Sequence, residues 1–321
     1  MFKLMLIAIK LALSGALIFY AFSKIDGDSA LRELHKLPIE AIVLTLLLLA
    51  IQYGLAAWRL RNLLHKEGAH SSIGVALDAV VIGAFFSQTL ISFVGGDAMR
   101  VWRVTRQNVA IGNATRAVLL DRLLGFVGLI ALITFGLPVL FHIVSDARVH
   151  TAIIILIGAA IIGCLLLAYF SRLPTWMRRH RLLTFVSKLS ETSRAILSDT
   201  RSLWTLLAIS LGIQIINVGV IYVSAVGLGV NLSALHCLVL VPPVLFLSMM
   251  PISFAGWGVR ESAMVAALAT VDVPPPQSLA LSISYGLALV VVSLPGALLW
   301  FRSRTKAKSM LRCDQNTRRP Y

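Results

Sequence analysis

Stretches of about twenty consecutive apolar residues recur along the chain and constrain its fold more than any other feature. A helix rises 1.5 Å per residue, so a run of this length matches the ~30 Å hydrocarbon core of a bilayer. Only 13% of the residues are charged and 58% are apolar, whereas a soluble domain carries about 25% charged residues. The sequence therefore predicts an all-α, polytopic membrane protein. The expected spanning helices are 4–22, 39–57, 117–140, 151–170, 203–226 and 278–301.

Two further apolar segments, 73–107 and 235–271, are interrupted by glycine or proline near their middles. A full crossing of the first segment would put the arginines that follow it on the outer face, against the positive-inside rule. The second segment must likewise return to the side on which it starts, because helix 278–301 has to reach the basic tail. We expect two re-entrant hairpins that enter the membrane from opposite faces.

The positive charges set the orientation of the chain. Lysine and arginine concentrate in 58–72, in 171–201 and in the tail 302–321, which places these segments and both termini in the cytoplasm, with the protein in the cell inner membrane. The formal net charge of +15 comes from short blocks beside apolar runs rather than from a basic face with interleaved aromatics, so no nucleic-acid partner is expected. An alternative for the N-terminus is a signal peptide that ends near Ala21.

A short repeat organises the predicted membrane domain, 1–301. Ile91-Ser92-Phe93-Val94-Gly95 is nearly repeated by Ile252-Ser253-Phe254-Ala255-Gly256, 161 residues further along. The same offset relates helix 39–57 to 203–226 and helix 117–140 to 278–301. We expect repeat 1 over about 1–140 and repeat 2 over about 151–301. An odd number of crossings per repeat inverts the second relative to the first, as in many secondary transporters.

Charged residues lie where the membrane is expected. A charge at the bilayer centre costs roughly 2.5–3.5 kcal/mol even on the lenient insertion scale, so each one needs a partner, water or a ligand. For Asp78, near the cytoplasmic side, a hydrated position and a functional one both remain open. The candidate residues for headgroup binding or transport are Asp97, Arg100, Asp121, Arg122, Arg260 and Glu261.

The spacing of these charges suggests how they pair. Asp97 and Arg100 are three residues apart and share a helical face. The neighbours Asp121 and Arg122, and likewise Arg260 and Glu261, point about 100° apart and are expected to find partners elsewhere. We expect pairs across the repeats, with Arg122 near Glu261 and Arg260 near Asp97 or Asp121. The alternative is a set of ion pairs that lock the hairpins and bind no ligand.

Glycines mark the predicted hairpin tips, at Gly95 and Gly96 in the first and Gly256 and Gly258 in the second. Helices that begin there direct N–H donors and positive dipole ends toward the tip. Guanidinium groups bind phosphate in a bidentate manner. The pattern therefore favours a site near the midplane for an anionic headgroup.

The remaining sequence features do not indicate a specific function. Residues 181–200 read either as an amphipathic helix on the cytoplasmic surface or as a plain linker helix. The three cysteines, Cys164, Cys237 and Cys313, are scattered, and the histidines show no ligand spacing, so neither a metal nor another cofactor is expected. No phosphate-binding loop of the Gly-x4-Gly-Lys-Ser/Thr type is present.

Three motifs carry a resemblance to a known family. They are Gly95-Gly96-Asp97-x-x-Arg100, the Asp121-Arg122 pair, and Pro251-x4-Gly256-x-Gly258-x-Arg260-Glu261. In this order and spacing the chain resembles the transmembrane region of lysylphosphatidylglycerol synthase, a flippase-like family, over nearly its whole length. The resemblance implies a membrane module that translocates a polar lipid, and it points to the same six charged residues. Trp257 and Phe93 depart from the family pattern as we expect it.

The function expected from these features is translocation or binding of a polar lipid such as an aminoacyl-phospholipid, a glycolipid or a polyprenyl-linked sugar. The chain stops about 20 residues after its last apolar run, so the aminoacyl-transferase domain of the two-domain synthases is not expected, and a transporter is favoured over an enzyme. The alternatives are an accessory protein of lipid or envelope synthesis, which would contact lipid-synthesis enzymes, and a membrane enzyme acting on lipid-linked substrates. The expected partners are lipids with an anionic or phosphate-bearing headgroup.

Overall fold

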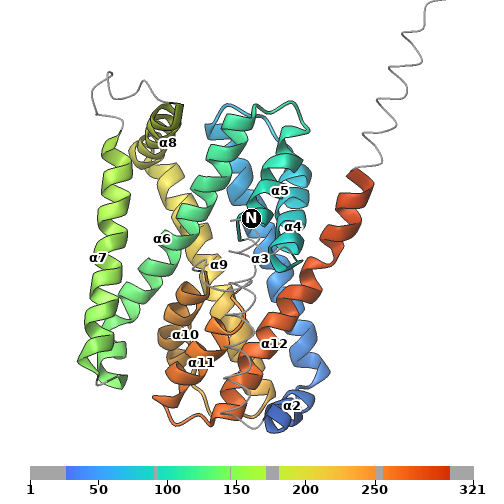
Figure 1. Ribbon diagram of the computed structural model, residues 1–321, viewed down its shortest axis with the longest axis vertical. Coiled ribbons are helices and arrows are strands. Elements are labelled where there is room, and N and C mark those ends of the chain that lie inside the picture. Colours follow the sequence, from blue (N-terminus) through green and yellow to red (C-terminus); the bar gives the residue numbers. More distant parts are fainter. Residues whose placement is uncertain (1–26, 90–92, 145, 171–180, 250–255, 304–321) are drawn as a thin grey trace, which may run out of the picture.

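The computed structural model describes residues 27–89, 93–144, 146–170, 181–249 and 256–303. Within these residues the protein is built from helices joined by short connections and contains no strand, which confirms the all-α, polytopic prediction (Figure 1). The predicted helix 4–22, residues 90–92 and 250–255 of the two interrupted segments, and most of the basic tail lie outside the described residues. Gly95 and Gly96, predicted to mark the first hairpin tip, lie within the helix Phe93–Thr105.

Five helices are long and apolar enough to span a membrane, and each covers one of the predicted spans. An apolar helical stretch carries the last of them on to Ser303. The five are α3 (Ile39–Lys66), α6 (Ile111–Ile143), α7 (Ala147–Tyr169), α9 (Thr200–Gly227) and α12 (Pro275–Ser293).

Helix α3 continues nine residues beyond the end predicted for it, which places Arg59 within the helix rather than in the cytoplasmic loop 58–72. Arg59 is 5% exposed. The apolar run stops before Arg59, but the helix continues, because Arg59 pairs with the buried carboxylate of Asp121. The helix ends where Gly68 takes φ 75° and lets the chain turn.

Each interrupted apolar segment forms a pair of shorter helices that pack on each other. The first pair is α4 (Ile73–Thr89) with α5 (Phe93–Thr105), and the second is α10 (Ala234–Met249) with α11 (Val259–Ala269). The first pair lies in the upper half of Figure 1 and the second in the lower half. The order of long helix, broken pair and long helix thus occurs twice, while the inverted relation and the re-entrant path stay predictions.

Small residues set how closely these elements approach. A Cβ at Gly96 in α5 would lie 2.5 Å from the Gly83 carbonyl oxygen and 3.0 Å from the Ser87 Cβ, both in α4. A Cβ at Gly128 in α6 would lie 3.0 Å from Ser210 in α9. Larger side chains here would push apart the helices that carry the charged residues.

The core forms where α6, α9, α10 and α12 meet, around buried side chains such as Leu129, Ile221, Val241 and Leu281. Helix α7 lies at the edge of the molecule, against α6 and α8 (Figure 1). Its apolar side chains face outward, with Ile155 65% exposed. An apolar surface of this kind is expected where lipid rather than water is the solvent.

Two shorter helices lie at opposite ends of the molecule (Figure 1). Helix α8 (Arg181–Ser198) buries Leu189 and Ile196 against the bundle, and the Thr192 hydroxyl donates to Glu67 Oε1 at 2.7 Å. The amphipathic pattern of residues 181–200 is therefore explained at least partly by packing on protein. Helix α2 (Gly27–His35) lies in the predicted loop 23–38 and packs through Ala30 on α12.

Candidate functional site

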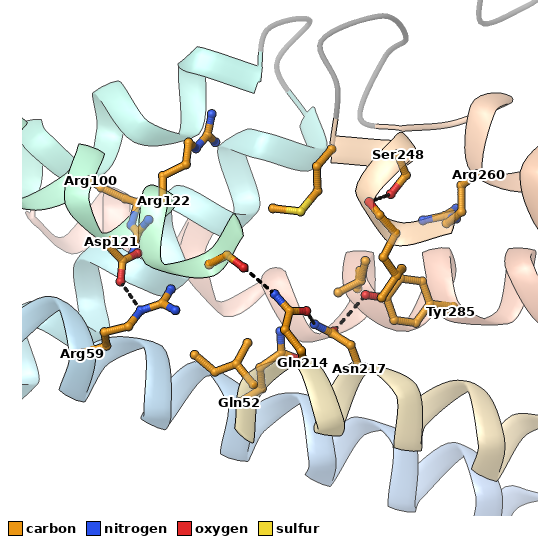
Figure 2. Close-up of a pocket in the computed structure, with 15 residues that line it drawn as sticks. Gln52, Arg59, Arg100, Asp121, Arg122, Gln214, Asn217, Ser248, Arg260 and Tyr285 are labelled. Carbon is orange, nitrogen blue, oxygen red and sulfur yellow. Dashed lines mark hydrogen bonds and ion pairs between the residues drawn. The ribbon is translucent and has the colours of Figure 1, made fainter. Parts of the chain in front are cut away.

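A polar cavity of about 300 Å³ lies among α3, α5, α6 and α9 on one side and α10, α11 and α12 on the other. Both broken helix pairs contribute to its wall, so segments far apart in the sequence meet here (Figure 2). Its polar lining residues are Gln52, Arg59, Arg100, Asp121, Arg122, Gln214, Asn217, Ser248, Arg260 and Tyr285.

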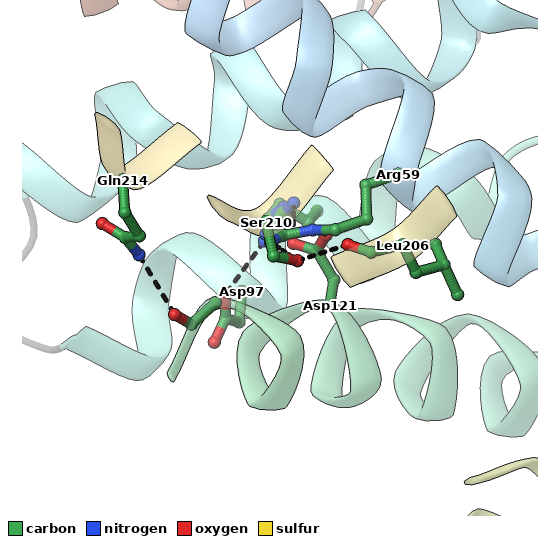
Figure 3. Close-up of polar contacts among 8 residues, drawn as sticks. Arg59, Asp97, Asp121, Leu206, Ser210 and Gln214 are labelled. Atoms are coloured by element: carbon green, nitrogen blue, oxygen red, sulfur yellow. Dashed lines mark hydrogen bonds and ion pairs between the residues drawn. The ribbon is translucent and has the colours of Figure 1, made fainter. Parts of the chain in front are cut away.

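Asp121 is the most enclosed carboxylate of the cavity wall, and two guanidinium groups hold it. Arg59 Nε lies 2.7 Å from Asp121 Oδ1, and Arg100 Nη2 lies 2.7 Å from Asp121 Oδ2. Arg59 also donates to the Ser210 hydroxyl at 2.9 Å, which fixes the guanidinium against α9 (Figure 3). This ion triad joins α3, α5 and α6, and its enclosure makes each partner costly to remove.

Asp97, which is not a lining residue of the cavity, links the triad to Arg122. Arg122 Nη2 lies 3.0 Å from Asp97 Oδ2, while Arg100 Nη1 approaches Asp97 Oδ1 only to 3.7 Å. Arg59, Arg100 and Arg122 thus share two carboxylates, which leaves one unit of positive charge in this cluster. The buried Nε of Arg100 has no hydrogen-bond partner among the described residues.

Arg260 and Glu261 form the charged pair of the second half, at the start of α11. Glu261 Oε1 lies 2.7 Å from Arg260 Nη2 and accepts a hydrogen bond from the Ser282 hydroxyl at 3.1 Å. Glu261 Oε2 accepts from the backbone N–H of Gly258 at 2.6 Å and so caps the helix. Gly258 has φ 85°, a conformation that favours glycine.

Aromatic rings position the Arg260 guanidinium as well. It lies 4.9 Å from the centre of the Trp257 ring and 5.5 Å from that of Tyr285, within the range of a cation–π contact. Trp257, which departs from the expected family pattern, therefore has a structural role here. The absence of a side chain at Gly286 makes room, because a Cβ there would collide with this guanidinium.

These pairs correct the predicted ones. Arg122 contacts Asp97 and Arg260 contacts Glu261, so the expected pairs of Arg122 with Glu261 and of Arg260 with Asp97 or Asp121 are wrong. The adjacent Arg260 and Glu261 meet because the long arginine side chain folds back over a carboxylate fixed at a helix N-terminus. The residues of the two halves converge on one cavity without pairing directly.

Uncharged polar groups line the stretch of the cavity between these two charged regions (Figure 2). The Tyr285 hydroxyl donates to Asn217 Oδ1 at 2.9 Å, Asn217 donates to Gln214 Oε1 at 3.1 Å, and Gln214 donates to the Gly125 carbonyl at 3.0 Å. Gln52 Oε1 is buried and lacks a hydrogen-bond partner among the described residues. We call Gln52, Gln214, Asn217 and Tyr285 the amide row.

The amide row and Arg59 are not among the site residues predicted from the sequence. The predicted residues are charged, whereas three of the amide row residues carry amides and the fourth a phenol. The sequence does contain a feature that predicts the amide row, because amide side chains within a membrane span also need hydrogen-bond partners. Arg59 was assigned to a loop because it directly follows an apolar run.

The remaining predicted residues lie away from the cavity wall. Asp78 pairs with Arg103 at 2.7 Å, and its side chain is 31% exposed. Gly96 serves the contact of α4 with α5, and Gly258 begins α11. Among the residues that the structure describes, no three His, Cys, Asp or Glu side chains could hold a metal ion together.

The fold and the site define a class: a multi-pass membrane protein with a cavity between its helices whose charged lining is mostly cationic. Its family follows from comparison with known sequences. Residues 7–296 match the model of the lysylphosphatidylglycerol synthase transmembrane region, and the chain belongs to this family. Membership supports a role in lipid or cell-envelope synthesis or transport. A search of curated proteins found no match.

Proposed function

We propose that the protein moves a polar lipid between the leaflets of the cell inner membrane and holds the phosphate-bearing headgroup in the cavity. The observation that carries this proposal is the convergence on one cavity of Arg100 and Arg260, from the two broken helix pairs, and of Arg122, from α6. A guanidinium is a good phosphate ligand because its N–H groups match two phosphate oxygens.

The charge of the cavity supports an anionic ligand. Four arginines and one aspartate line it, and the adjacent Asp97 and Glu261 still leave the region with a net charge of +1. An uncompensated charge in a low-dielectric region is costly, so a bound anion would lower the free energy of this arrangement. A volume of about 300 Å³ is at the small end of ligand sites and suits a headgroup rather than a whole lipid.

The arrangement of the helix pairs supports transport. We place α4 with α5 as a hairpin from the cytoplasmic face and α10 with α11 as one from the opposite face, with both termini cytoplasmic. In transporters built as inverted repeats, the substrate site lies between such broken elements, and access alternates between the two faces. The cavity lies between the two pairs, where this mechanism requires a site.

Neither ATP hydrolysis nor bond chemistry is part of the proposal. The sequence contains no phosphate-binding loop of the ATPase type, so movement would be passive or coupled to an ion. We expect no catalytic turnover, and the carboxylates Asp97, Asp121 and Glu261 are assigned to orient the arginines. One of them would carry a proton if transport is proton-coupled.

The pairing of all three carboxylates favours a second candidate. Asp97, Asp121 and Glu261 each contact an arginine, as expected if the charges only lock the helices of an accessory protein in lipid synthesis. The two functions predict different effects when a cavity arginine is replaced by a neutral residue of similar size. An accessory protein needs a folded structure, whereas a transporter also needs its cationic ligands.

The test is leaflet exchange of a fluorescent phosphatidylglycerol in proteoliposomes. Arg122→Gln and Arg260→Gln should each slow exchange at least about tenfold, which is ~1.4 kcal/mol in the barrier. Arg103→Gln is the matched control, because Arg103 pairs with Asp78 outside the cavity wall, and it should keep most of the activity. An absence of exchange by folded wild-type protein would favour the accessory function.

A further inference from the structure

The lining residues of the cavity also indicate which kind of headgroup it binds, an inference that rests on the proposed function. Its charged lining consists of four arginines and one aspartate. That aspartate, Asp121, is held by two guanidinium groups at 2.7 Å each. No carboxylate of the described lining is therefore free to receive a cation.

The carboxylates next to the lining are engaged as well. Asp97 contacts Arg122 and Arg100, and both oxygens of Glu261 accept hydrogen bonds, from Arg260, Ser282 and the Gly258 N–H. Segments 90–92 and 250–255, which lie outside the described residues, contain no acidic residue, and the N-terminal stretch 1–26 contains one, Asp26, directly before α2. An ammonium group in this cavity would meet fixed positive charge without a counter-ion.

Unlike the arginines, the amide row is uncharged, and its side chains can both donate and accept hydrogen bonds. Its hydrogen bonds run from Tyr285 to Asn217 to Gln214 to the Gly125 carbonyl, and each donor and acceptor pair leaves further capacity on the amides. Gln52 Oε1 is a buried acceptor whose hydrogen bond is unmade among the described residues. A hydroxyl of a bound ligand would satisfy it.

We infer that the cavity selects anionic lipids whose phosphate carries a neutral, hydroxylated headgroup, and that it rejects cationic aminoacylated lipids. The phosphate lies against Arg100 and Arg122 at one end of the cavity, and the hydroxyls lie along the amide row toward Arg260 at the other end. The lysyl group in the name of the family is then not part of the substrate of this member. Selectivity arises from the net charge of the wall together with the unmet acceptor at Gln52.

Three lipids with the same labelled acyl chain test this inference in proteoliposomes: phosphatidylglycerol, phosphatidic acid and lysylphosphatidylglycerol. The first carries phosphate and hydroxyls, the second phosphate alone, and the third an added cationic group. Phosphatidylglycerol should exchange at least about tenfold faster than the lysyl lipid and several-fold faster than phosphatidic acid. Equal exchange of phosphatidylglycerol and the lysyl lipid would overturn the inference and leave lipid translocation intact, whereas exchange of none would overturn the proposed function itself.

Two substitutions at Gln52 test whether this residue of the cavity wall determines the headgroup preference. Gln52→Glu replaces an amide with a carboxylate of the same size, and it should raise the exchange of the lysyl lipid relative to phosphatidylglycerol. Gln52→Leu removes the acceptor and should reduce the preference for phosphatidylglycerol over phosphatidic acid. Circular dichroism and elution volume establish that both variants fold. If both folded variants keep the wild-type ratios of exchange rates among the three lipids, Gln52 does not contact the headgroup and the inference fails.

Discussion

At the scale of residues, specific side chains neutralise the buried charges. Arg59 and Asp121 are 5% and 2% exposed, and Arg100 shares the same carboxylate. The sequence identified Asp121 and Arg100 as charges in need of partners. It could not name the partners, because a contact of α3 with α6 joins residues 62 positions apart.

Replacing Asp121 with asparagine should destabilise the protein strongly. The substitution leaves Arg59 and Arg100 without a counter-ion in an enclosed region, a change that costs about 3–5 kcal/mol when one partner of a buried pair is removed. Thermal unfolding in detergent measures the loss. Asp78→Asn, whose side chain is 31% exposed, should cost less than about 1 kcal/mol; equal losses would mean that the triad is hydrated and not structurally important.

Gly286→Ala should impair transport more than it impairs stability. The added methyl group would meet the Arg260 guanidinium and the Trp257 ring, so Arg260 must leave its position in the cavity wall. We expect slower exchange of phosphatidylglycerol with a smaller loss of unfolding temperature than in Asp121→Asn, because Glu261 keeps its hydrogen bonds from the Gly258 N–H and Ser282. Gly219→Ala in α9 is the control, since a Cβ there meets nothing within 4 Å. Full exchange in the Gly286 variant would show that the position of Arg260 does not matter.

At the scale of helices, hydropathy and positive charge predicted most of what is observed. The spans, the two broken pairs and their order in the chain follow from the apolar runs and their interruptions, although Gly95 and Gly96 lie inside α5 rather than before it. Helix ends were less predictable, because α3 and α6 continue past the apolar region through charged residues that pair with each other. Glu67 at the end of α3, for example, binds Arg116 near the start of α6 at 2.7 Å.

Cysteine labelling tests whether the broken pairs are re-entrant. Single cysteines at His70 and Gln107, on either side of the α4 and α5 pair, should both react from the cytoplasm. Single cysteines at Asn231 and Thr270, on either side of α10 and α11, should both react from the other face. The native Cys164, Cys237 and Cys313 are replaced first. Labelling of the two positions of a pair from opposite faces would show that this pair crosses the membrane.

An ion pair between α3 and α9 predicts a pH dependence outside the spans. Lys66 Nζ lies 2.7 Å from Asp199 Oδ2. Hydrogen bonds from Lys66 and Ser202 lower the pKa of Asp199 well below its usual value. A lowered pKa stabilises the fold above the unfolded-state pKa, about 3.9, and this contribution disappears as the pH falls through the folded-state value.

The matched variant is Asp199→Asn, which keeps an N-cap for α9 and loses the ion pair. The difference in unfolding temperature between wild type and this variant should be constant above about pH 5 and shrink on further acidification. The contribution is small because the pair is exposed and screened by salt. A difference that grows toward low pH would contradict the assignment.

At the scale of the whole molecule, two halves converge on one cavity. The sequence predicted a shared site, because a repeat with two broken segments implies one, and residues of both halves line the cavity. The sequence did not predict the amide row or the local pairing of Arg260 with Glu261. Both depend on how α9, α11 and α12 pack, which in turn depends on small residues such as Gly286.

The most direct test of the account compares two neutralised ion pairs in the leaflet exchange of phosphatidylglycerol. The double variant Asp97→Asn with Arg122→Gln removes a pair at the cavity, and Asp78→Asn with Arg103→Gln removes one outside its wall. Each double variant removes one positive and one negative charge and so leaves the net charge of its region unchanged, which means that a purely structural role predicts similar behaviour. We predict that the first abolishes exchange and the second preserves it. Wild-type exchange by a folded first variant would contradict the claim that this cavity carries the headgroup.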